Sequence, residues 1–589
     1  HSAQGGEMSS KTGSILRCLD PEIIIPISRQ STEHFNTGTW SRLRPVFSEK
    51  TSPCRTACPV GNDIPRALYR ASRGDDDGAL AAFLQESPLP GVCGRVCYHP
   101  CQAPCNRAEL DGAVRVRALE RSVAERGEAL PLSLTEAGRG KPVAVVGSGP
   151  AGLAAAYHLA RMGHPVTLVE EAQEPGGLLS RGIPPFRLPP DALKRDLDRI
   201  LNLPIDLKCN QPIDEGSLAG LGAEHQAVFL ATGAAHHQSL GLDGEDMMGV
   251  LPGLAFLRHA GLQAGAKGAK VLVIGGGNTA MDAARTALRR GAENVTVLYR
   301  RTREEMPVFA DEVAEAEEEG VMFRFLSGPV AFLGGNRGVE AVRFHKMRLT
   351  TPEGDGRPRP EPREGSEEEL DCDLVLVAAG QSVEPVTMLK ELRFETGRVW
   401  VDTWGQTSKS GIFAGGDVTP RRASVVDAMA SGKRAALAIH LSLFGKIDMN
   451  AVKGVELGEG PAFSIAAFFN RPSHWDPHHV VLMDELDRLT SPPASPAEVP
   501  HLNPVDRKGS FEEVVHSMSA DQTLKEAGRC FFCGSCVGCD RCYIFCPEGA
   551  VIPPEKEGET YVAHNDYCKG CGTCATVCVR GILENKEGA

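Results

Sequence analysis

Sixteen of the nineteen cysteines in this 589-residue chain fall into two short stretches, six within residues 54–105 and ten within residues 530–578. The other three stand apart at Cys18, Cys209 and Cys372. A disulfide framework suits a small secreted domain, whereas two dense groups in a long chain indicate metal centres. The cysteines therefore predict two metal-binding regions, one near each end of the chain.

The second group contains the spacing C-x2-C-x2-C-x3-C twice, and Pro547 follows the first copy. This is the bacterial ferredoxin pattern for two [4Fe–4S] clusters, in which the fourth cysteine of each run ligates the other cluster. It predicts one cluster on Cys536, Cys539, Cys542 and Cys578, and another on Cys568, Cys571, Cys574 and Cys546. Structural zinc also binds C-x2-C pairs, but two complete runs with a proline favour iron–sulfur clusters. Cys530 and Cys533 are surplus, either as spare thiols or as competitors for a corner, and the proline favours the first.

Residues 143–170 combine a β-rich run, VAVV, with the glycine motif GSGPAG and an alanine-rich helical pattern. A dinucleotide is expected here because the motif follows a strand and opens a helix. The first glycine permits the turn, the second lets the backbone approach a pyrophosphate, and the third lets helix and strand pack closely. Glu170 lies about 20 residues on, where an acid bonds a ribose hydroxyl. The candidate cofactor residues are Gly147, Gly149, Pro150, Ala151, Gly152 and Glu170.

A second unit of the same kind, residues 271–299, carries the motif GGGNTA. Its candidate cofactor residues are Gly275, Gly277, Asn278, Thr279 and Ala280. The second strand ends in Arg300 and Arg301, where an acidic residue would select NAD. Arginine can pair with a 2′-phosphate and favours NADP. A solvated basic edge is the alternative, so the sequence leaves NAD(P)H open.

The third glycine-rich strand end, IFAGGDVTP, supplies Gly416 and Asp417. The Asp417 carboxylate is a natural acceptor for ribityl or pyrophosphate hydroxyl groups. Combined with the first unit, it predicts a flavin site built from distant segments, with the second unit inserted between them to hold the nicotinamide nucleotide. Neither nucleotide region contains C-x2-C, which excludes thioredoxin reductase-like disulfide chemistry.

Several stretches together resemble the small (β) subunit of glutamate synthase and its relatives, over roughly residues 50–445. The stretches are RVCYHPCQAPC, LER, GSGPAGL, GGLLSRGIPPFRLP, LATGA, IGGGNTAMD, YRRTREEMP and AGGDV. The resemblance implies FAD at the first nucleotide site and NAD(P)H at the second, with hydride transfer followed by single-electron steps. It also implies further cofactor contacts at Gly177, Leu178, Thr232, Gly233 and Gly380. With its ferredoxin-like tail, the chain looks most like the DsrL-type NAD(P)H:acceptor oxidoreductase of the dissimilatory sulfite reductase system.

The resemblance also implies an N-terminal [4Fe–4S] cluster on Cys58, Cys97, Cys101 and Glu120. The family usually has a further C-x2-C upstream, which completes a second N-terminal cluster, and this chain lacks it. Cys54, Cys93 and Cys105 are too few for that second cluster by themselves, so it stays doubtful. The alternative for Glu120 is a solvated helix charge.

The expected fold is α/β, with one Rossmann-like domain inserted in another and an iron–sulfur module at each end. The expected domains are a helical iron–sulfur domain (1–140), a divided FAD domain (141–245 and 381–453), an NAD(P)H domain (246–380), a linker (454–528) and a ferredoxin-like domain (529–589). Residues 352–369, rich in Pro, Glu, Arg and Gly, are expected to form an exposed loop. Residues 1–7 precede Met8 and are expected to be an extension ahead of the natural start.

Composition narrows the possible partners. A net charge of −13 argues against nucleic-acid binding, and no apolar run is long enough for a membrane span or a signal peptide. A cytoplasmic protein is therefore expected, and the resemblance implies an NAD(P)H:acceptor oxidoreductase whose partner is dissimilatory sulfite reductase; a homodimer is left open. Alternatives are the electron-input subunit of glutamate synthase or of a 2-oxoacid:ferredoxin oxidoreductase, or a non-catalytic iron–sulfur sensor or scaffold. Hydride transfer needs no acid–base residue, so the sequence predicts no catalytic side chain.

Overall fold

The computed structural model describes residues 36–128, 140–234, 236–353, 357–383, 391–420, 423–444, 452–470, 474–486, 492–555 and 561–587. The N-terminal extension expected at residues 1–7 lies outside them. The described residues form two compact units, a larger one within 47–539 and 577–583 and a smaller one within 36–46, 540–576 and 584–587. No helix among these residues has the length and apolar character needed to cross a bilayer.

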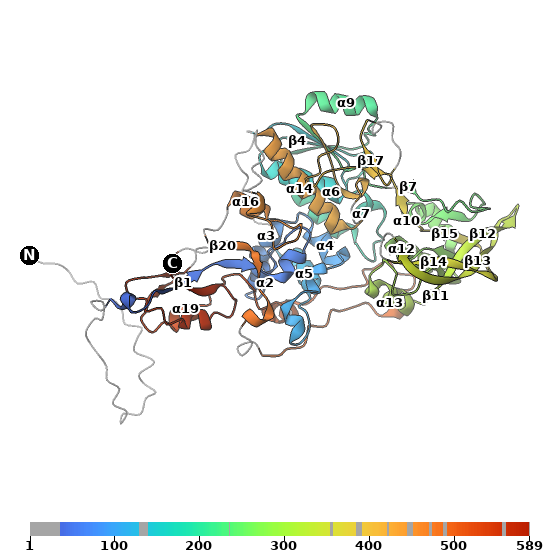
Figure 1. Ribbon diagram of the computed structural model, residues 1–589. Helices are drawn as coiled ribbons and strands as arrows, with labels where there is room; N and C mark the ends of the chain where they lie inside the picture. Colours follow the sequence, from blue (N-terminus) through green and yellow to red (C-terminus); the bar gives the residue numbers. More distant parts are fainter. Residues whose placement is uncertain are drawn as a thin grey trace, which may run out of the picture. The chain divides into compact units, whose positions relative to one another are not determined.

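The first nucleotide domain is built on a parallel sheet in the order β19-β6-β3-β4-β5. Figure 1 labels its strand β4 and two helices of the domain, α6 and α14. Its strands are β3 (Val143–Val146), β4 (Val166–Val169), β5 (Ile205–Lys208), β6 (Ala227–Leu230) and β19 (Ile412–Ala414). Every residue of β3 and β6 is buried, as expected for a parallel sheet covered on both faces. Helices α6 (Pro150–Arg161) and α14 (Val425–Leu443) pack closely, because a Cβ on Gly432 would lie 2.0 Å from the carbonyl oxygen of Ala151.

The second nucleotide domain has its own parallel sheet, in the order β11-β10-β9-β15-β8. Its strands are β8 (Val250–Pro252), β9 (Lys270–Ile274), β10 (Asn294–Leu298), β11 (Met322–Arg324) and β15 (Leu374–Val377), with helices α10 (Gly253–Arg258), α12 (Asn278–Arg289) and α13 (Ala310–Glu318). Strands β7 (His236–His237) and β16 (Gln381–Ser382) pair where the chain enters and leaves this domain. The domain is therefore inserted in the first, and the expected α/β fold class is confirmed.

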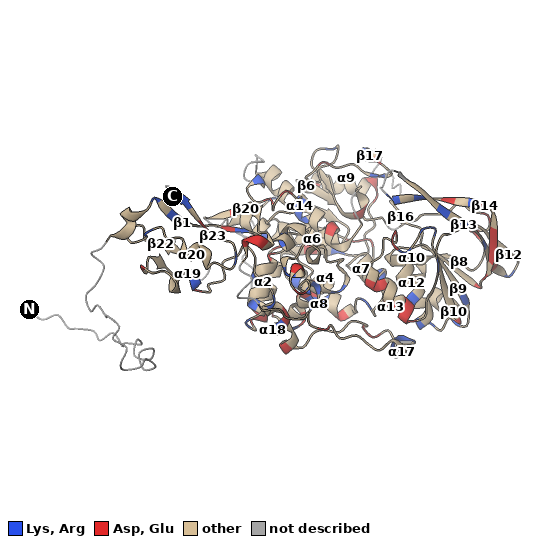
Figure 2. Ribbon diagram, turned by 60° about the horizontal axis from the view of Figure 1, so that its bottom comes forward, with Lys and Arg blue, Asp and Glu red and all other residues tan. Residues whose placement is uncertain are grey.

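The loop expected at residues 352–369 is wrong. Most of it belongs to a three-stranded antiparallel sheet of β12 (Ser327–Gly335), β13 (Gly338–Glu353) and β14 (Arg357–Asp371). Oppositely charged side chains pair across the strands, as in Arg343–Glu369 at 2.8 Å and Arg348–Glu361 at 3.0 Å. Figure 2 shows acidic and basic residues along β13 and β14. Such pairs stabilise a solvated sheet, so a sequence poor in apolar residues still forms strands.

The N-terminal helical domain consists of α1 (Pro53–Ala57), α2 (Ile64–Ala71), α3 (Asp76–Leu84), α4 (Pro90–Val96) and α5 (Val116–Arg126). Asp63 and Asp75 cap α2 and α3 by accepting hydrogen bonds from backbone N–H groups one turn on. Phe83 and Leu119 are fully buried in a hydrophobic core that this domain shares with the parallel sheet of the first nucleotide domain. The helical domain is therefore packed directly on the first nucleotide domain.

The segment expected to be a linker, residues 454–528, carries regular elements of its own. These are α16 (Ile465–Phe469), β20 (Trp475–Val480), α17 (Pro504–Arg507) and α18 (Ala520–Gly528). Strand β20 pairs in parallel with β2 (Glu49–Thr51). Leu457 and Phe463 are buried in the same core as the N-terminal helices. These contacts tie the described part of the segment to the helical domain.

The smaller unit contains α19 (Arg541–Ile544) and α20 (Thr573–Thr576), each four residues long. Strands β21 (Val551–Ile552) and β22 (Val562–Ala563) pair antiparallel between them. Short helices joined by cysteine-bearing loops are what the ferredoxin spacing predicts.

Candidate active site and iron–sulfur centres

In GSGPAG, the fold itself requires glycine at two of the three positions, Gly147 and Gly152, but not at Gly149. Gly147 has a φ of +96°, and a Cβ there would lie 2.4 Å from the carbonyl oxygen of Ala231; a Cβ on Gly152 would lie 1.8 Å from that of Gly147. Gly149 has an ordinary φ of −68°, and no described atom lies within 4 Å of where its Cβ would be. The space at the N-terminus of α6 is the cradle that a pyrophosphate requires.

Other predicted flavin residues meet at this cradle. A Cβ on Gly177, whose φ is +58°, would lie 2.9 Å from the Cα of Gly149, and Leu178 begins α7 (Leu178–Arg181) directly after it. Strands β3, β6 and β19 are neighbours in one parallel sheet, so the segments that follow them meet at its carboxyl edge. That edge carries Gly147, Thr232, Gly233, Gly416 and Asp417.

The two acidic residues of the flavin site lie in different environments. The Glu170 carboxylate is buried and accepts hydrogen bonds from the backbone N–H of Ser148 at 2.9 Å and from its hydroxyl at 2.6 Å. Glu170 thus stabilises the glycine turn through Ser148. Its hydrogen bond to a ribose stays a prediction. Asp417 is half-buried, and burial raises the pKa of its carboxyl while Arg398 opposes this shift.

The second cradle repeats the arrangement. A Cβ on Gly275 would lie 2.3 Å from the carbonyl oxygen of Ala378, whereas around Gly277 the described atoms leave the corresponding space open. Asn278 begins α12, and its side-chain oxygen is buried with no hydrogen-bond partner among the described residues. Thr279 and Ala280 follow in the first turn of the helix. Gly380, with a φ of +140°, lies beyond the end of β15, next to β9. An open cradle and an orphaned polar atom fit a bound nucleotide.

Arg300 and Arg301 follow β10 in different settings. Arg301 is buried, and its Nε donates to the carbonyl oxygen of Pro358 at 2.8 Å, so it anchors the antiparallel sheet. Arg300 is exposed at the carboxyl end of the strand, where the 2′ position of a nucleotide ribose is read. Of the two predicted residues, Arg300 is therefore the exposed one.

The four predicted ligands of the N-terminal cluster line one cavity. Cys58, Cys97, Cys101 and Glu120 border it together with Cys93. Glu120 is buried, its Oε1 is unpartnered among the described residues, and burial, with Asp196 adding to it, raises the pKa of its carboxyl to about 8. A buried carboxylate without a partner is costly, and an iron of a cluster would supply the missing one.

Among the C-terminal cysteines, Cys546, Cys568, Cys571 and Cys574 line one cavity of the smaller unit. They are the predicted ligands of one cluster, and the Cys546 sulfur already accepts a hydrogen bond from the backbone N–H of Ala550 at 3.2 Å. Cys536, Cys539 and Cys578 belong to the larger unit and Cys542 to the smaller, so their grouping stays a prediction from spacing. The described cysteines form no disulfide, and no three metal-ligating side chains of the described residues already converge on one ion position.

Three family models match the chain. Residues 141–432 match the pyridine nucleotide-disulphide oxidoreductase model, residues 47–130 the dihydropyrimidine dehydrogenase domain II with a 4Fe-4S cluster, and residues 535–582 the 4Fe-4S dicluster domain.

Curated relatives match over longer stretches. The NADPH-Fe(3+) oxidoreductase subunit beta of Geobacter sulfurreducens is 36% identical over 82% of this chain and 75% of its own length. The glutamate synthase [NADPH] small chain of Escherichia coli is 35% identical over 65% of this chain and 87% of its own length. This chain belongs to the glutamate synthase small-subunit family of FAD- and NAD(P)H-dependent iron–sulfur oxidoreductases. The NADP(+)-dependent formate dehydrogenase subunit beta of Moorella thermoacetica is 38% identical over 66% of this chain, which spans only 59% of that protein.

Membership of this family confirms that the chain is an oxidoreductase with FAD, NAD(P)H and [4Fe–4S] domains at both ends. The match at residues 535–582 overturns the zinc alternative, because that model describes a 4Fe-4S dicluster. The non-catalytic sensor is likewise excluded as the chain's class, because the relatives named above are oxidoreductases or their subunits.

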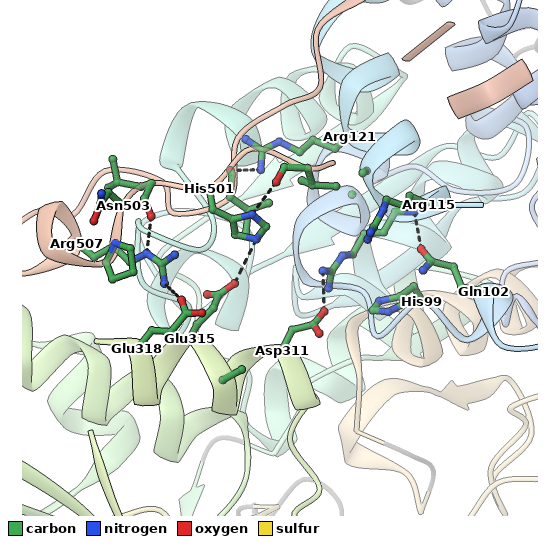
Figure 3. A pocket seen from close by; sticks show the side chains of 18 residues that line it. His99, Gln102, Arg115, Arg121, Asp311, Glu315, Glu318, His501, Asn503 and Arg507 are labelled. Atoms are coloured by element: carbon green, nitrogen blue, oxygen red, sulfur yellow. Dashed lines mark hydrogen bonds and ion pairs between the residues drawn. The ribbon is translucent and has the colours of Figure 1, made fainter. Parts of the chain in front are cut away.

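In this chain, a polar cavity of about 610 Å³ lies between the N-terminal helical domain and the second nucleotide domain (Figure 3). Ion pairs cross between the elements that border it: Arg117 with Asp311 at 3.5 Å, and Arg507 with Glu318 at 2.9 Å. The rings of Tyr98, from the helical domain, and Phe309, the residue before α13, also stack with centroids 6.1 Å apart. The sequence did not reveal this contact, because its residues are spread over three distant segments.

Proposed function

We propose that this chain is an NADPH:acceptor oxidoreductase whose electrons pass to or from a redox protein partner. When bound, FAD exchanges a hydride with the nicotinamide, and the iron–sulfur clusters accept and release single electrons. The protein positions these groups and sets their potentials. No acid–base side chain is assigned, because hydride transfer requires none.

The observation that carries the proposal is that one helix joins the flavin cradle to the N-terminal cysteine cavity. At its first turn, α14 places Val426 in the wall of the cavity lined by Cys58 and Glu120. About one turn further along α14, the Ser431 hydroxyl accepts a hydrogen bond from the backbone N–H of Gly416 at 2.7 Å. Gly416 lies at the carboxyl edge of the sheet, where the flavin is predicted. The residues of α14 that border the two predicted sites are five positions apart, about 7.5 Å along the helix axis, so the fold would hold a cluster and a flavin on neighbouring parts of one helix.

The preference for NADPH rests on Arg300. Arg300 follows β10 at the position in the sequence where an acidic residue would select NAD, and a guanidinium binds a phosphate through charge-assisted hydrogen bonds. The names of the Geobacter and Escherichia relatives both specify NADPH. Replacing Arg300 by alanine is therefore expected to raise KM for NADPH about tenfold or more, equivalent to ~1.4 kcal/mol or more, with little change for NADH. Arg303, an exposed arginine paired with Glu317, supplies the matched control, Arg303→Ala.

The proposed partner is dissimilatory sulfite reductase, with electrons from sulfur oxidation reducing NAD(P)+ in the physiological direction. Its support is the resemblance of the complete arrangement, from the helical module to the ferredoxin-like tail. A glutamate synthase large subunit and a 2-oxoacid:ferredoxin oxidoreductase are the alternatives, since the same electron path serves either. A cytoplasmic location and a homodimer stay predictions.

Partner choice is tested by mixing the anaerobic, NADPH-reduced protein with each purified candidate and following reoxidation of its flavin. An artificial one-electron acceptor checks that the protein itself is active. Saturable reoxidation by dissimilatory sulfite reductase, faster than by the other two candidates, supports the proposal. Reoxidation by the artificial acceptor together with no effect of sulfite reductase contradicts the partner while leaving the oxidoreductase intact.

A further inference from the structure

Five cysteines of the two groups are ligands in none of the predicted clusters. One of them, Cys93, borders the N-terminal cluster cavity, and the other four are Cys54, Cys105, Cys530 and Cys533. The first two lie in the N-terminal group, and the last two precede the dicluster match that begins at residue 535. More than four hundred residues separate the two pairs in the sequence. The structure nevertheless brings both pairs into one region of the larger unit.

Cys533 is held beside Cys105 by a side chain. Asn106, the residue after Cys105, is buried, and its amide donates to the Cys533 sulfur at 3.4 Å and to the carbonyl oxygen of Val481 at 2.9 Å. An N–H donor to a cysteine sulfur stabilises the thiolate form that metals bind.

Cys54 reaches the same place through backbone contacts. The N–H of Lys50 donates to the carbonyl oxygen of Gly534 at 2.8 Å, which places the strand before Cys54 against the residue after Cys533. A Cβ on Gly534 would lie 2.8 Å from the carbonyl of Lys50, so a larger residue would separate the two segments. The Ser52 hydroxyl lies 3.2 Å from the Cys54 sulfur.

Buried ion pairs fix the segment that leads into Cys530. Arg529, 5% exposed, pairs with Asp111 at 2.8 Å and with Glu526 at 2.8 Å. Glu526 is fully buried and also accepts from the backbone N–H of Arg115 at 2.9 Å. These contacts join the end of α18 to the loop that follows Cys105, so the approach of Cys530 to Cys105 is built into the core.

The Cys530–Cys533 loop has the backbone of a cluster-binding loop. In Cys536–Cys539 and Cys568–Cys571, the residue before the second cysteine is Gly538 or Gly570, with φ values of +64° and +65°. At the equivalent position of Cys530–Cys533, Phe532 has a φ of +53°. A bulky residue adopts this left-handed conformation only where the surroundings impose it, at a cost of about 1–3 kcal/mol. The N–H of Phe532 donates to the Cys530 sulfur at 3.3 Å.

We infer that Cys54, Cys105, Cys530 and Cys533 together hold a fourth [4Fe–4S] cluster. The C-x2-C pair missing upstream of Cys54 is thereby supplied from the other end of the chain. The pKa of Cys54 is raised first by burial and then by three neighbouring thiols, those of Cys530, Cys105 and Cys533, as expected for sulfurs that share one site. Arg580, whose guanidinium stacks 5.2 Å from the Phe532 ring centroid, offsets the negative charge of a thiolate-ligated cluster.

The position of this site makes it a relay. Cys54 is the second residue of α1 and Cys58 directly follows the helix, so the two are about 6 Å apart along the helix axis. Cys533 and Cys536 are three residues apart, so their Cα atoms lie at most about 11 Å apart. Within the larger unit, the ligands of the fourth cluster are therefore close along the chain both to Cys58 of the N-terminal cluster and to Cys536, the first cysteine of the ferredoxin pattern. This relay role rests on the proposed function, whereas the existence of the cluster does not.

Iron and acid-labile sulfide counted per FAD on the whole chain, purified and reconstituted without oxygen, test the cluster directly. Four cubanes predict about sixteen irons, and the double variant Cys530→Ser/Cys533→Ser predicts about twelve, four per remaining cluster. The control Cys209→Ser, which changes a cysteine outside both groups, keeps sixteen.

The wild-type count keeps the inference falsifiable even if the double variant does not fold, which its FAD content would reveal. About twelve irons per FAD in the wild-type protein overturns the inference. So does one zinc per chain in addition to twelve irons, or a folded double variant that retains all sixteen irons.

Discussion

The ammonium group of Lys433 and the carboxylate of Glu86 form an ion pair in which each side chain is only 1% exposed. The Lys433 Nζ also donates to the carbonyl oxygens of Val60 at 2.7 Å and Phe463 at 2.8 Å. Glu86 accepts from the backbone N–H of Ile465 at 3.0 Å. Three parts of the chain, the helical iron–sulfur domain, the flavin-side helix α14 and the segment after it, thus meet at one buried pair.

Removing one partner of this pair is expected to destabilise the protein by about 3–5 kcal/mol, because the other charge stays buried and uncompensated. The substitution Lys433→Met does this while preserving much of the volume. The double variant Lys433→Met/Glu86→Met should recover part of the loss. Urea unfolding followed by flavin release measures it. The exposed pair Lys409–Glu391 provides the control, Lys409→Met, with an effect below about 1 kcal/mol; equal effects of the two single variants would refute this account of the buried pair.

Alanine at Gly277 is expected to weaken NAD(P)H binding about tenfold or more without affecting the fold. The backbone there has a φ of −94°, which alanine adopts readily, and a methyl group would meet no described atom, only the space where the pyrophosphate approaches. Titration of the nucleotide against the FAD-loaded protein gives the affinity, and the melting temperature should not fall. Gly265→Ala, at an equally open glycine away from the cradle, serves as the control. Unchanged nucleotide affinity in Gly277→Ala would mean that the nucleotide binds elsewhere.

Glu120→Ala is expected to convert the N-terminal cluster to a three-iron form. Three cysteines remain in that cavity, so the iron that Glu120 ligates would be lost, lowering the count by about one per chain. Electron paramagnetic resonance of the oxidised protein should then show a three-iron signal that the wild-type protein lacks. Glu109→Ala, at an exposed glutamate of the same domain, should leave the spectrum unchanged. An unaltered wild-type spectrum in Glu120→Ala would show that Glu120 is no ligand.

The His164–His440 pair predicts a loss of stability in acid. The rings are hydrogen-bonded at 3.0 Å, and His164 Nδ1 lies 2.9 Å from the Lys141 carbonyl oxygen. In the neutral pair His164 Nδ1 therefore donates to that carbonyl, and His440 Nδ1 donates to His164 Nε2. Burial, with His164 adding to it, lowers the pKa of His440 from 6.5 to about 4. The unfolded chain thus binds the proton more readily than the folded one.

The stability contributed by neutral His440 is complete above pH 6.5 and is lost as pH falls toward 4. Because the ring is half-buried, the expected loss is about 2 kcal/mol rather than the ~3 kcal/mol of a fully buried group. His440→Gln removes the titration and should flatten this part of the unfolding profile, unlike the control His516→Gln at an exposed histidine. A profile as steep in His440→Gln as in the wild-type protein would assign the acid sensitivity to other groups.

The parts of the molecule that depend on local spacing could be predicted from the sequence. GSGPAG and GGGNTA each lie between a buried strand and a helix. The strand, the glycine turn and the cradle could therefore be predicted from one continuous stretch of sequence in each case. The same holds for Cys568, Cys571 and Cys574, which lie within seven consecutive residues. The β13–β14 sheet could not be predicted in this way, because its strands are stabilised by cross-strand charge pairs such as Arg343–Glu369 rather than by an apolar pattern.

Contacts between distant segments account for the rest. Arg301 has the right position in sequence for a phosphate ligand, but its Nε is bonded to the carbonyl of Pro358, which only the folded sheet brings near. Cys530 and Cys533 were surplus by spacing, because the cysteines that we infer to complete their site, Cys54 and Cys105, lie more than four hundred residues away. Tertiary packing through Asn106 and Arg529 is what brings them to Cys105.

The measurement that tests the central claim most directly is rapid anaerobic mixing of the FAD- and cluster-loaded protein with NADPH. Flavin absorbance and the electron paramagnetic resonance of samples frozen at successive times would be followed together. The account predicts that the flavin bleaches first, that reduced-cluster signals then appear at a matching rate, and that NADPH acts faster than NADH. Cluster reduction that precedes flavin bleaching, or a flavin that neither nucleotide bleaches, would contradict it.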